Sequence, residues 1–167
     1  NTTGADNTAL GDNALGANTT ALNNTAVGSS AMLVNTTGTQ NVAVGAYALD
    51  ANTTANGNTA LGYAAMSTNS TGASNTAVGL QALTGNTTAS NNTAVGYLAM
   101  NANTTGTRNV AVGAYALDAN TTANYNIAMG YNSLGVNTTG ANNVAVGDSA
   151  LGAVSYTHLT LPTIYSV

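Results

Sequence analysis

The side chains that could carry out acid–base or metal chemistry are few in this sequence and lie far apart. The 167 residues include five Asp, one Arg and one His, and no Glu, Lys or Cys. Catalysis by paired carboxylates needs two carboxyl groups within about 10 Å of each other. Asp50 and Asp118, which share a place in the repeat described below, lie four repeats apart. We therefore predict no catalytic residue, no cofactor site and no metal site, and we expect the chain not to be an enzyme.

The charge balance is acidic and limits the partners that can be expected. The net charge is −4, whereas nucleic-acid binding depends on clustered Lys and Arg that neutralise phosphates. We therefore expect no binding to nucleic acid. The sequence also lacks a run of about 18 apolar residues, so we expect no membrane insertion of this segment.

Asn–Thr sequences are the most regular chemical signal. The pattern N-[TS]-T, which matches the acceptor for N-glycosylation, begins at evenly spaced Asn residues. The candidates for glycosylation are Asn18, Asn35, Asn52, Asn69, Asn86, Asn103, Asn120 and Asn137, with Asn1 as a further match at the start. Asn23 and Asn91 match the pattern outside this spacing. The alternative, which we favour, is that Asn and Thr have a structural role and match the acceptor pattern by coincidence.

Thr and Tyr suggest two further surface chemistries. The two hydroxyl residues that follow each of these Asn, such as Thr36 and Thr37, could form two regular rows that order water, as in ice-binding solenoids. The alternative, a Thr-rich turn, is favoured. Six Tyr occupy variable places in the repeat: Tyr47, Tyr63, Tyr97, Tyr115, Tyr125 and Tyr131. They could stack on carbohydrate, although incidental surface or interface aromatics are the favoured interpretation.

Two Asn and one Gly recur every 17 residues over nine repeats, from Asn1 to Ala153, without exception. We call the residues at equivalent places in the repeats a column. The first Asn column comprises Asn1 and the eight candidates for glycosylation named above. The second Asn column comprises Asn7, Asn24, Asn41, Asn58, Asn75, Asn92, Asn109, Asn126 and Asn143. The Gly column comprises Gly11, Gly28, Gly45, Gly62, Gly79, Gly96, Gly113, Gly130 and Gly147.

Each repeat holds two short apolar segments, separated by the Gly column. In the first segment an invariant Ala, such as Ala43, stands between Thr, Val or Ile on one side and Leu, Val or Met on the other. Alternation along a strand places this Ala on one face and its neighbours on the opposite face. The second segment is Ala or Ser followed by Leu or Met, as in Ala48 and Leu49. Both segments are too short for helices, and Gly and Asn are too frequent.

We predict an all-β fold, a parallel β-solenoid (β-roll) of nine 17-residue coils with two short strands in each coil. Stacking in register would turn each column into a row along the rod, and both Asn columns into hydrogen-bonded ladders. The unbroken Gly column is the candidate for a corner with positive φ. Another column alternates strictly between Gly and Ala, as in Gly38 and Ala55, so it should not require positive φ.

The repeat pattern NTAVGxxAL…NTTG resembles repeats of bacterial and phage tail-fibre-domain proteins. It is also similar to the head repeats of trimeric autotransporter adhesins, which share the Asn–x–Ala/Val–hydrophobic–Gly core, although a period of 17 is longer than theirs. This resemblance covers Asn1–Ala153. It implies a β-roll, assembly as a homotrimer and display at a surface.

The resulting functional hypothesis is a non-enzymatic structural and adhesive fibre segment, from a phage tail fibre or a bacterial surface adhesin. Its location would be extracellular, at a cell surface or on a virion, and its partner a host-surface receptor or glycan. Two alternatives remain. One is a repeat surface that binds ice or glycan, and the other is a self-assembling extracellular filament, because stackable uncapped ends favour polymerisation.

The repeat ends at Ala153, and residues 154–167 form an atypical tail. Its sequence VSYTHLTLPT resembles the conceptual translation of a common transposase-type sequencing adapter. We interpret it as non-native read-through; the alternative is a genuine capping segment of the solenoid. On either interpretation His158, the single His, is not a catalytic candidate. The predicted organisation is therefore a nine-coil solenoid at 1–153 and a tail at 154–167.

Overall fold

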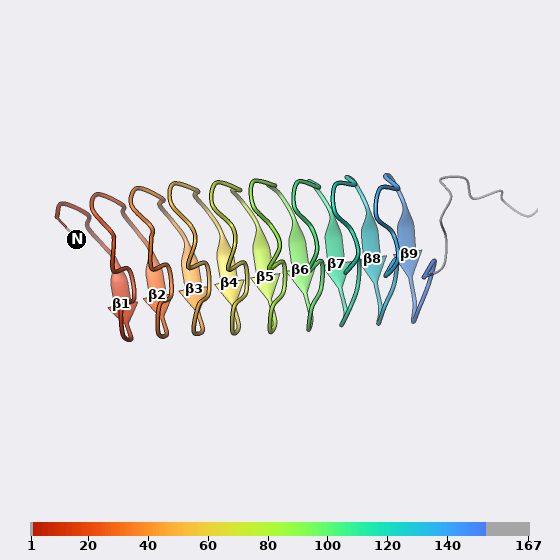
Figure 1. Cartoon of the computed structure of the whole chain (residues 1–167), viewed down its shortest axis with the longest axis horizontal. Helices are drawn as coiled ribbons and strands as arrows, with labels where there is room; N and C mark the ends of the chain where they lie inside the picture. Colours follow the sequence, from red (N-terminus) through yellow and green to blue (C-terminus); the bar gives the residue numbers. More distant parts are fainter. Residues whose placement is uncertain (1, 153–167) are drawn as a thin grey trace, which may run out of the picture.

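The computed structural model describes residues 2–152, which form a β-solenoid with one strand in every repeat (Figure 1). The strands are β1 (Thr8–Leu10), β2 (Thr25–Val27), β3 (Val42–Val44), β4 (Thr59–Leu61), β5 (Thr76–Val78), β6 (Thr93–Val95), β7 (Val110–Val112), β8 (Ile127–Met129) and β9 (Val144–Val146). Within the described residues there is no helix, and so none that could cross a membrane. The predicted all-β class and parallel solenoid are confirmed. The predicted tail, residues 154–167, lies outside the described part.

All nine strands belong to one sheet, and each pairs in parallel with the next strand in sequence. The register is the same throughout: Ala26 lies opposite Ala43, and Ala43 opposite Ala60. Each column of the repeat therefore becomes a row that runs along the rod. The loops before the strands, such as 35–41, lie along one edge of the rod, and the loops after them, such as 45–47, lie along the other (Figure 1). We call these the strand-start edge and the strand-end edge.

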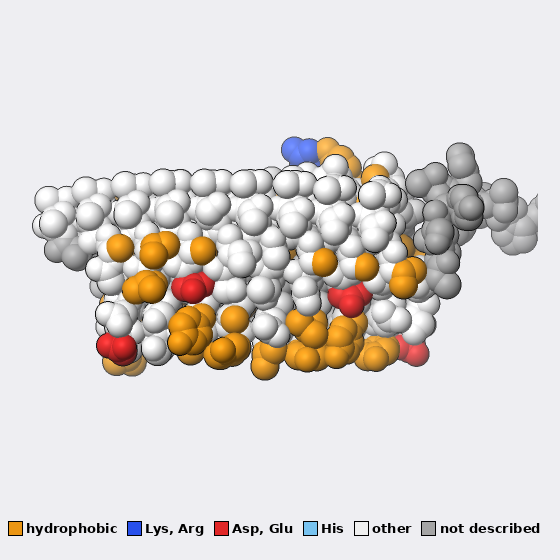
Figure 2. Space-filling view, viewed as in Figure 1, with side chains coloured by type: hydrophobic (Ala, Val, Ile, Leu, Met, Phe, Trp, Pro, Cys, Tyr) orange, Lys and Arg blue, Asp and Glu red, His pale blue; other side chains and the backbone are white. Residues whose placement is uncertain are grey.

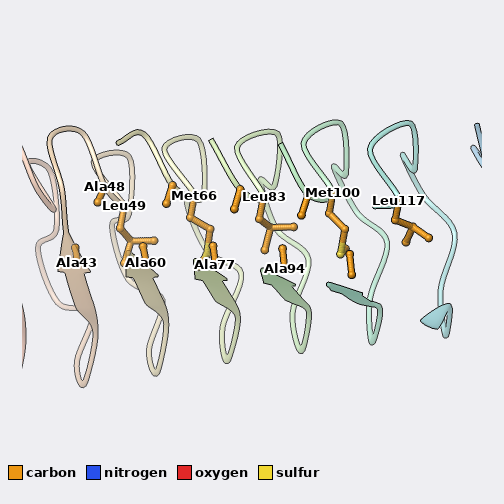
Figure 3. Close-up of a cluster of buried hydrophobic side chains, with 14 of the residues drawn as sticks. Ala43, Ala48, Leu49, Ala60, Met66, Ala77, Leu83, Ala94, Met100 and Leu117 are labelled. Atoms are coloured by element: carbon orange, nitrogen blue, oxygen red, sulfur yellow. The ribbon is translucent and has the colours of Figure 1, made fainter. Parts of the chain in front are cut away.

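A narrow core of Ala, Leu and Met side chains fills the inside of the coils. The strand contributes its central Ala, such as Ala77, and the segment that returns after the Gly corner contributes a consecutive pair such as Ala82 and Leu83; all three are fully buried. Figure 3 shows Met66, Leu83 and Met100 pointing from this return segment toward the strand alanines. Because a Leu or Met from every coil fills the space facing the strand, a residue larger than Ala would overpack the core.

The second apolar segment of each coil is not a strand, so the prediction of two strands per coil was wrong. Ala82 and Leu83 are adjacent and both buried, whereas the alternation of a strand would turn one of them outward. Left-handed backbone resolves this conflict, with φ of 55° at Gln81 and 54° at Leu83. Such backbone costs about 1–2 kcal/mol at a residue other than Gly. Hydrogen bonds to both neighbouring coils offset that cost: the Gln81 N–H donates to Tyr63 O and the Leu83 N–H to Ala99 O, both at 2.9 Å.

The Gly column forms the corner that follows each strand. Its φ angles lie between 126° and 138°, a region that side chains other than hydrogen rarely permit. Space is also lacking, because a Cβ on Gly79 would lie 2.4 Å from the carbonyl oxygen of Gly96 in the next coil. Backbone contact between coils therefore explains why no other residue type occurs in this column.

We predict that Gly79→Ala destabilises the solenoid by about 3 kcal/mol or more, since backbone strain and the contact with Gly96 act together. The control is Gly57→Asn. Gly57 has φ 68°, and a Cβ there would meet nothing closer than Ser74 Oγ at 3.8 Å. Asn23 and Asn91 occupy equivalent places with φ 58° and 63°. Urea unfolding followed by far-UV circular dichroism measures both. Equal midpoints for the two variants would contradict the role assigned to the corner.

Candidate functional site

The first Asn column lies inside the strand-start edge and connects the coils through its side-chain amides. Asn86, which is fully buried, donates from Nδ2 to Oδ1 of Asn69 in the preceding coil at 2.7 Å and to the carbonyl oxygen of Ala89 in its own coil at 3.0 Å. Equivalent bonds to the preceding Asn recur from Asn52 to Asn137. Each amide therefore ties its own loop to the coil before it.

The second Asn column precedes the strands and makes a second set of bonds. The backbone N–H of Asn75 donates to Oδ1 of Asn58 at 2.9 Å, and Oδ1 of Asn75 accepts the N–H of Asn92 at 2.9 Å. The Nδ2 of Asn75 reaches forward to the carbonyl oxygen of Ala89 at 2.9 Å. That carbonyl thus accepts two amides, one from Asn86 of its own coil and one from Asn75 of the coil before.

The alternating Gly/Ala column divides the first Asn column into pairs. The bond from Asn86 to Asn69 is 2.7 Å, whereas the bond from Asn103 to Asn86 is 3.1 Å. The acceptor of the shorter bond, Asn69, belongs to the coil that contains Gly72. A Cβ on Gly72 would lie 2.5 Å from Oδ1 of Asn69 and 2.1 Å from the carbonyl oxygen of Ala89. Gly is therefore required at alternate coils to bring two Asn amides together, and the structural unit is two coils.

Burial leaves no room for glycans on the eight candidate Asn residues of the folded chain. The eight candidates are buried, namely Asn18, Asn35, Asn52, Asn69, Asn86, Asn103, Asn120 and Asn137. Their Nδ2 atoms, to which a glycan would be attached, donate hydrogen bonds within the rod. The hypothesis of glycosylation at these residues therefore does not fit the folded coils. The two matches outside the regular spacing, Asn23 and Asn91, are exposed.

The two expected rows of hydroxyls differ from each other. Thr36 donates its hydroxyl to the carbonyl oxygen of Thr53 at 3.1 Å, and equivalent residues of seven other coils do the same. The neighbouring residue, Thr37 in that coil, is exposed in every coil from Thr3 to Thr139. One row of hydroxyls thus belongs to the coil-to-coil bonding, and a single row faces outward.

Five Tyr form two groups at the strand-end edge, a proximity that their scattered places in the sequence did not reveal. The rings of Tyr47 and Tyr63 lie edge to face with centroids 5.9 Å apart and planes at 81°. Tyr115 and Tyr131 repeat this arrangement at 5.8 Å and 80°, and Tyr97 extends the second group at 5.2 Å from Tyr115. The signal that could have revealed them is that their columns adjoin at one turn, so Tyr residues of successive coils must meet.

Asp50 and Asp118 are the carboxylates whose protonation the fold changes. Burial raises the pKa of each above 3.8, and the N–H groups of the same and the next residue offset this only in part. The Oδ1 atoms of both are buried without a hydrogen-bond partner in the described part of the chain. Among the residues described, no group of three or more potential metal-ligating side chains occurs.

The outer face of the sheet consists of the residues on either side of the strand Ala, from Thr8 and Leu10 in β1 to Val144 and Val146 in β9. Its exposed large hydrophobic side chains are Leu10, Val42, Leu61, Val112, Ile127, Met129, Val144 and Val146. These residues come from six of the nine strands, whereas β2, β5 and β6 contribute half-buried Thr and Val. Large exposed apolar patches are a common feature of interaction surfaces. Comparisons with protein-family models, curated sequences and solved structures find no match to this chain.

We predict that Asn75→Leu lowers the free energy of unfolding by about 2–4 kcal/mol, because it removes the buried acceptor of the Asn92 N–H and one donor to Ala89 O. The matched control is Asn91→Ser, which changes an exposed Asn to the residue found at the equivalent Ser74. Chemical unfolding measures both variants. Unchanged stability of Asn75→Leu would show that the ladder is not a source of stability.

The raised pKa values of Asp50 and Asp118 predict a pH dependence. The folded chain retains these protons to higher pH than the unfolded chain, so their stabilising contribution is fully present below pH 3.8 and is lost as pH rises through the raised pKa values. The double variant Asp50→Asn/Asp118→Asn introduces the residue type that Asn101 provides in the same column, and should therefore be more stable than the parent at pH 7. We expect a gain below about 1 kcal/mol, because solvent screens half-exposed carboxylates. Thermal unfolding at pH 3 and pH 7 tests this; a gain of equal size at both would contradict it.

Proposed function

We propose that this chain is a structural and adhesive fibre segment, a non-enzymatic rod of a phage tail fibre or bacterial surface adhesin that assembles as a homotrimer. The observation that carries the proposal is the outer face of the sheet. Six of the nine strands expose a large apolar side chain on this face, and β2, β5 and β6 present half-buried Thr and Val there. The face extends about 40 Å at the usual strand spacing. The resemblance of the repeat to tail-fibre and adhesin-head repeats supports the same function, with display outside the cell or on a virion.

The core of a single rod also favours association. Apart from Leu and Met in the return segment, the buried apolar side chains are Ala, so each coil removes little apolar surface from water by itself. Packing three outer sheet faces together would bury additional Val, Leu, Ile and Met side chains. The even register of the coils lets identical faces meet along their whole length, as a symmetric assembly requires.

The rod would act mechanically, holding a receptor-binding part away from the surface that carries it. In-register hydrogen bonds between all successive strands suit that role, because a pull along the rod is shared by every column. The ice-binding alternative has weaker support, since one of its two expected hydroxyl rows is used within the rod. The filament alternative remains a hypothesis.

The test is the mass of the chain in solution. Sedimentation equilibrium should give three times the 16.3 kDa of one chain. Leu61→Lys, which places a charge in the middle of the outer sheet face, should give a monomer with an unchanged circular dichroism spectrum, because a buried unpaired charge is costly.

Thr71→Lys is the matched control, since it adds the same charge at an exposed site on the strand-start edge. It should assemble as the parent does. A monomeric parent chain, or loss of assembly in both variants, would contradict assembly through the outer sheet face.

A further inference from the structure

Two copies of one side-chain set lie on the rod outside the outer sheet face. The first set is Tyr47, Tyr63 and Asp50, and the second is Tyr115, Tyr131 and Asp118. Their ring geometries agree within 0.1 Å and 1°. Asp50 follows Tyr47 by three residues, as Asp118 follows Tyr115, and the charge of Asp118 acts on Tyr115. Figure 2 shows acidic side chains near groups of hydrophobic side chains on one side of the rod. We call each set a Tyr–Asp site.

Both sites are negative, and no cationic side chain of residues 2–152 is in contact with either. The Oδ1 of each Asp is buried without a hydrogen bond within residues 2–152, so its charge is poorly compensated and gains from a cation nearby. The faces of the Tyr rings add a negative quadrupole. The negative charge of Asp118 acts on Tyr115, whose pKa is raised first by its hydrogen bond with Tyr97 and then by burial and by the neighbouring Tyr and Asp charges.

The chain itself shows how a cation binds to such a ring. Its single Arg, Arg108, places its guanidinium 5.4 Å from the centre of the Tyr125 ring in the next coil and donates to the Tyr125 hydroxyl. This contact lies at the other edge of the rod, where the blue side chain stands out in Figure 2. Arg108 is the only cationic side chain in the described part of the chain, and Tyr125 is its partner. Within residues 2–152 no second cationic side chain is therefore left for the Tyr–Asp sites.

We propose that each Tyr–Asp site binds the guanidinium of an arginine in a basic partner segment, with the rings facing the cation and the carboxylate pairing with it. Planar guanidinium groups stack on aromatic rings and pair with carboxylates better than ammonium groups do. The net charge of −4 favours approach of a basic segment. This inference goes beyond the proposed fibre function and does not rest on it.

The spacing of the two sites defines the partner further. They lie four coils apart, about 19 Å at a strand spacing of about 4.8 Å. An extended peptide advances about 3.3 Å per residue, so two arginines about six positions apart would reach both sites of one rod. Simultaneous binding raises affinity without any new contact.

The experiment uses the intact chain and labelled, otherwise uncharged peptides, with fluorescence anisotropy at low salt as the readout. A peptide with two arginines six positions apart should bind at least about tenfold more tightly than one with the arginines two positions apart. Replacing both arginines by citrulline, which is neutral but similar in shape, should abolish binding.

The protein variants identify the residues. Asp50→Asn/Asp118→Asn and Tyr47→Leu/Tyr115→Leu should each weaken binding at least tenfold; the same columns contain Asn101 and Leu98, so both changes have precedents in the fold. The control Asp6→Asn changes a carboxylate at the strand-start edge, the other edge of the rod, to the residue found at Asn23, and should not alter binding.

The proposal would be overturned by no binding of the two-arginine peptide, by equal binding of the citrulline peptide, or by equal losses in Asp6→Asn and Asp50→Asn/Asp118→Asn. Binding of a neutral oligosaccharide in place of the peptide would also overturn it and assign the rings to carbohydrate. Sedimentation of the same samples gives the oligomeric state separately, so a monomeric chain that binds the peptide refutes only the trimer.

Discussion

The carbonyl oxygen of the Gly/Ala column is the acceptor on which the rest of the rod depends. At Ala89 it receives the amide of Asn86 from its own coil and the amide of Asn75 from the coil before. These bonds lie in a buried interior, where an unpaired amide or carbonyl would be costly. They therefore fix the register of the loops, and the register of the loops aligns the strands. The strand Ala and the Leu/Met of the return segment can then form one continuous core.

This constraint also determines where variation is possible. Columns whose side chains bond or pack inside the rod hold one or two residue types, whereas the columns at the strand-end edge hold Asp, Ser, Ala, Tyr, Leu, Asn and Gln. Chemistry that distinguishes one coil from another is consequently confined to the edges and the outer sheet face. The Tyr–Asp sites and the exposed apolar side chains occupy those places, so binding can change without altering the framework.

Much of the fold could be predicted from the sequence because the same residue types occur at the same places in nine repeats. The strand Ala column holds no larger residue and the Gly column holds no other residue, which indicates that neither place has space for a larger side chain. The return segment was misjudged because left-handed backbone at Leu and Met contradicts their ordinary preferences, and only bonding to coils on both sides makes it acceptable. The adjacent buried Ala and Leu contained the clue. Pairing of Tyr47 with Tyr63 was missed because the two residues stand in different columns, and those columns meet only where the chain turns after the Gly corner.

The pairing of Gly coils with Ala coils has a consequence for how such a rod changes length. Gain or loss of a single coil would place two Ala coils or two Gly coils side by side, and one junction would lose the fit that holds Gly72 against Ala89. Gain or loss of two coils preserves every junction. Insertions or deletions of an even number of coils should therefore be tolerated better than those of an odd number. The near-identical segments 35–51 and 103–119 lie four coils apart, an even number, and so agree with duplication of coils in pairs.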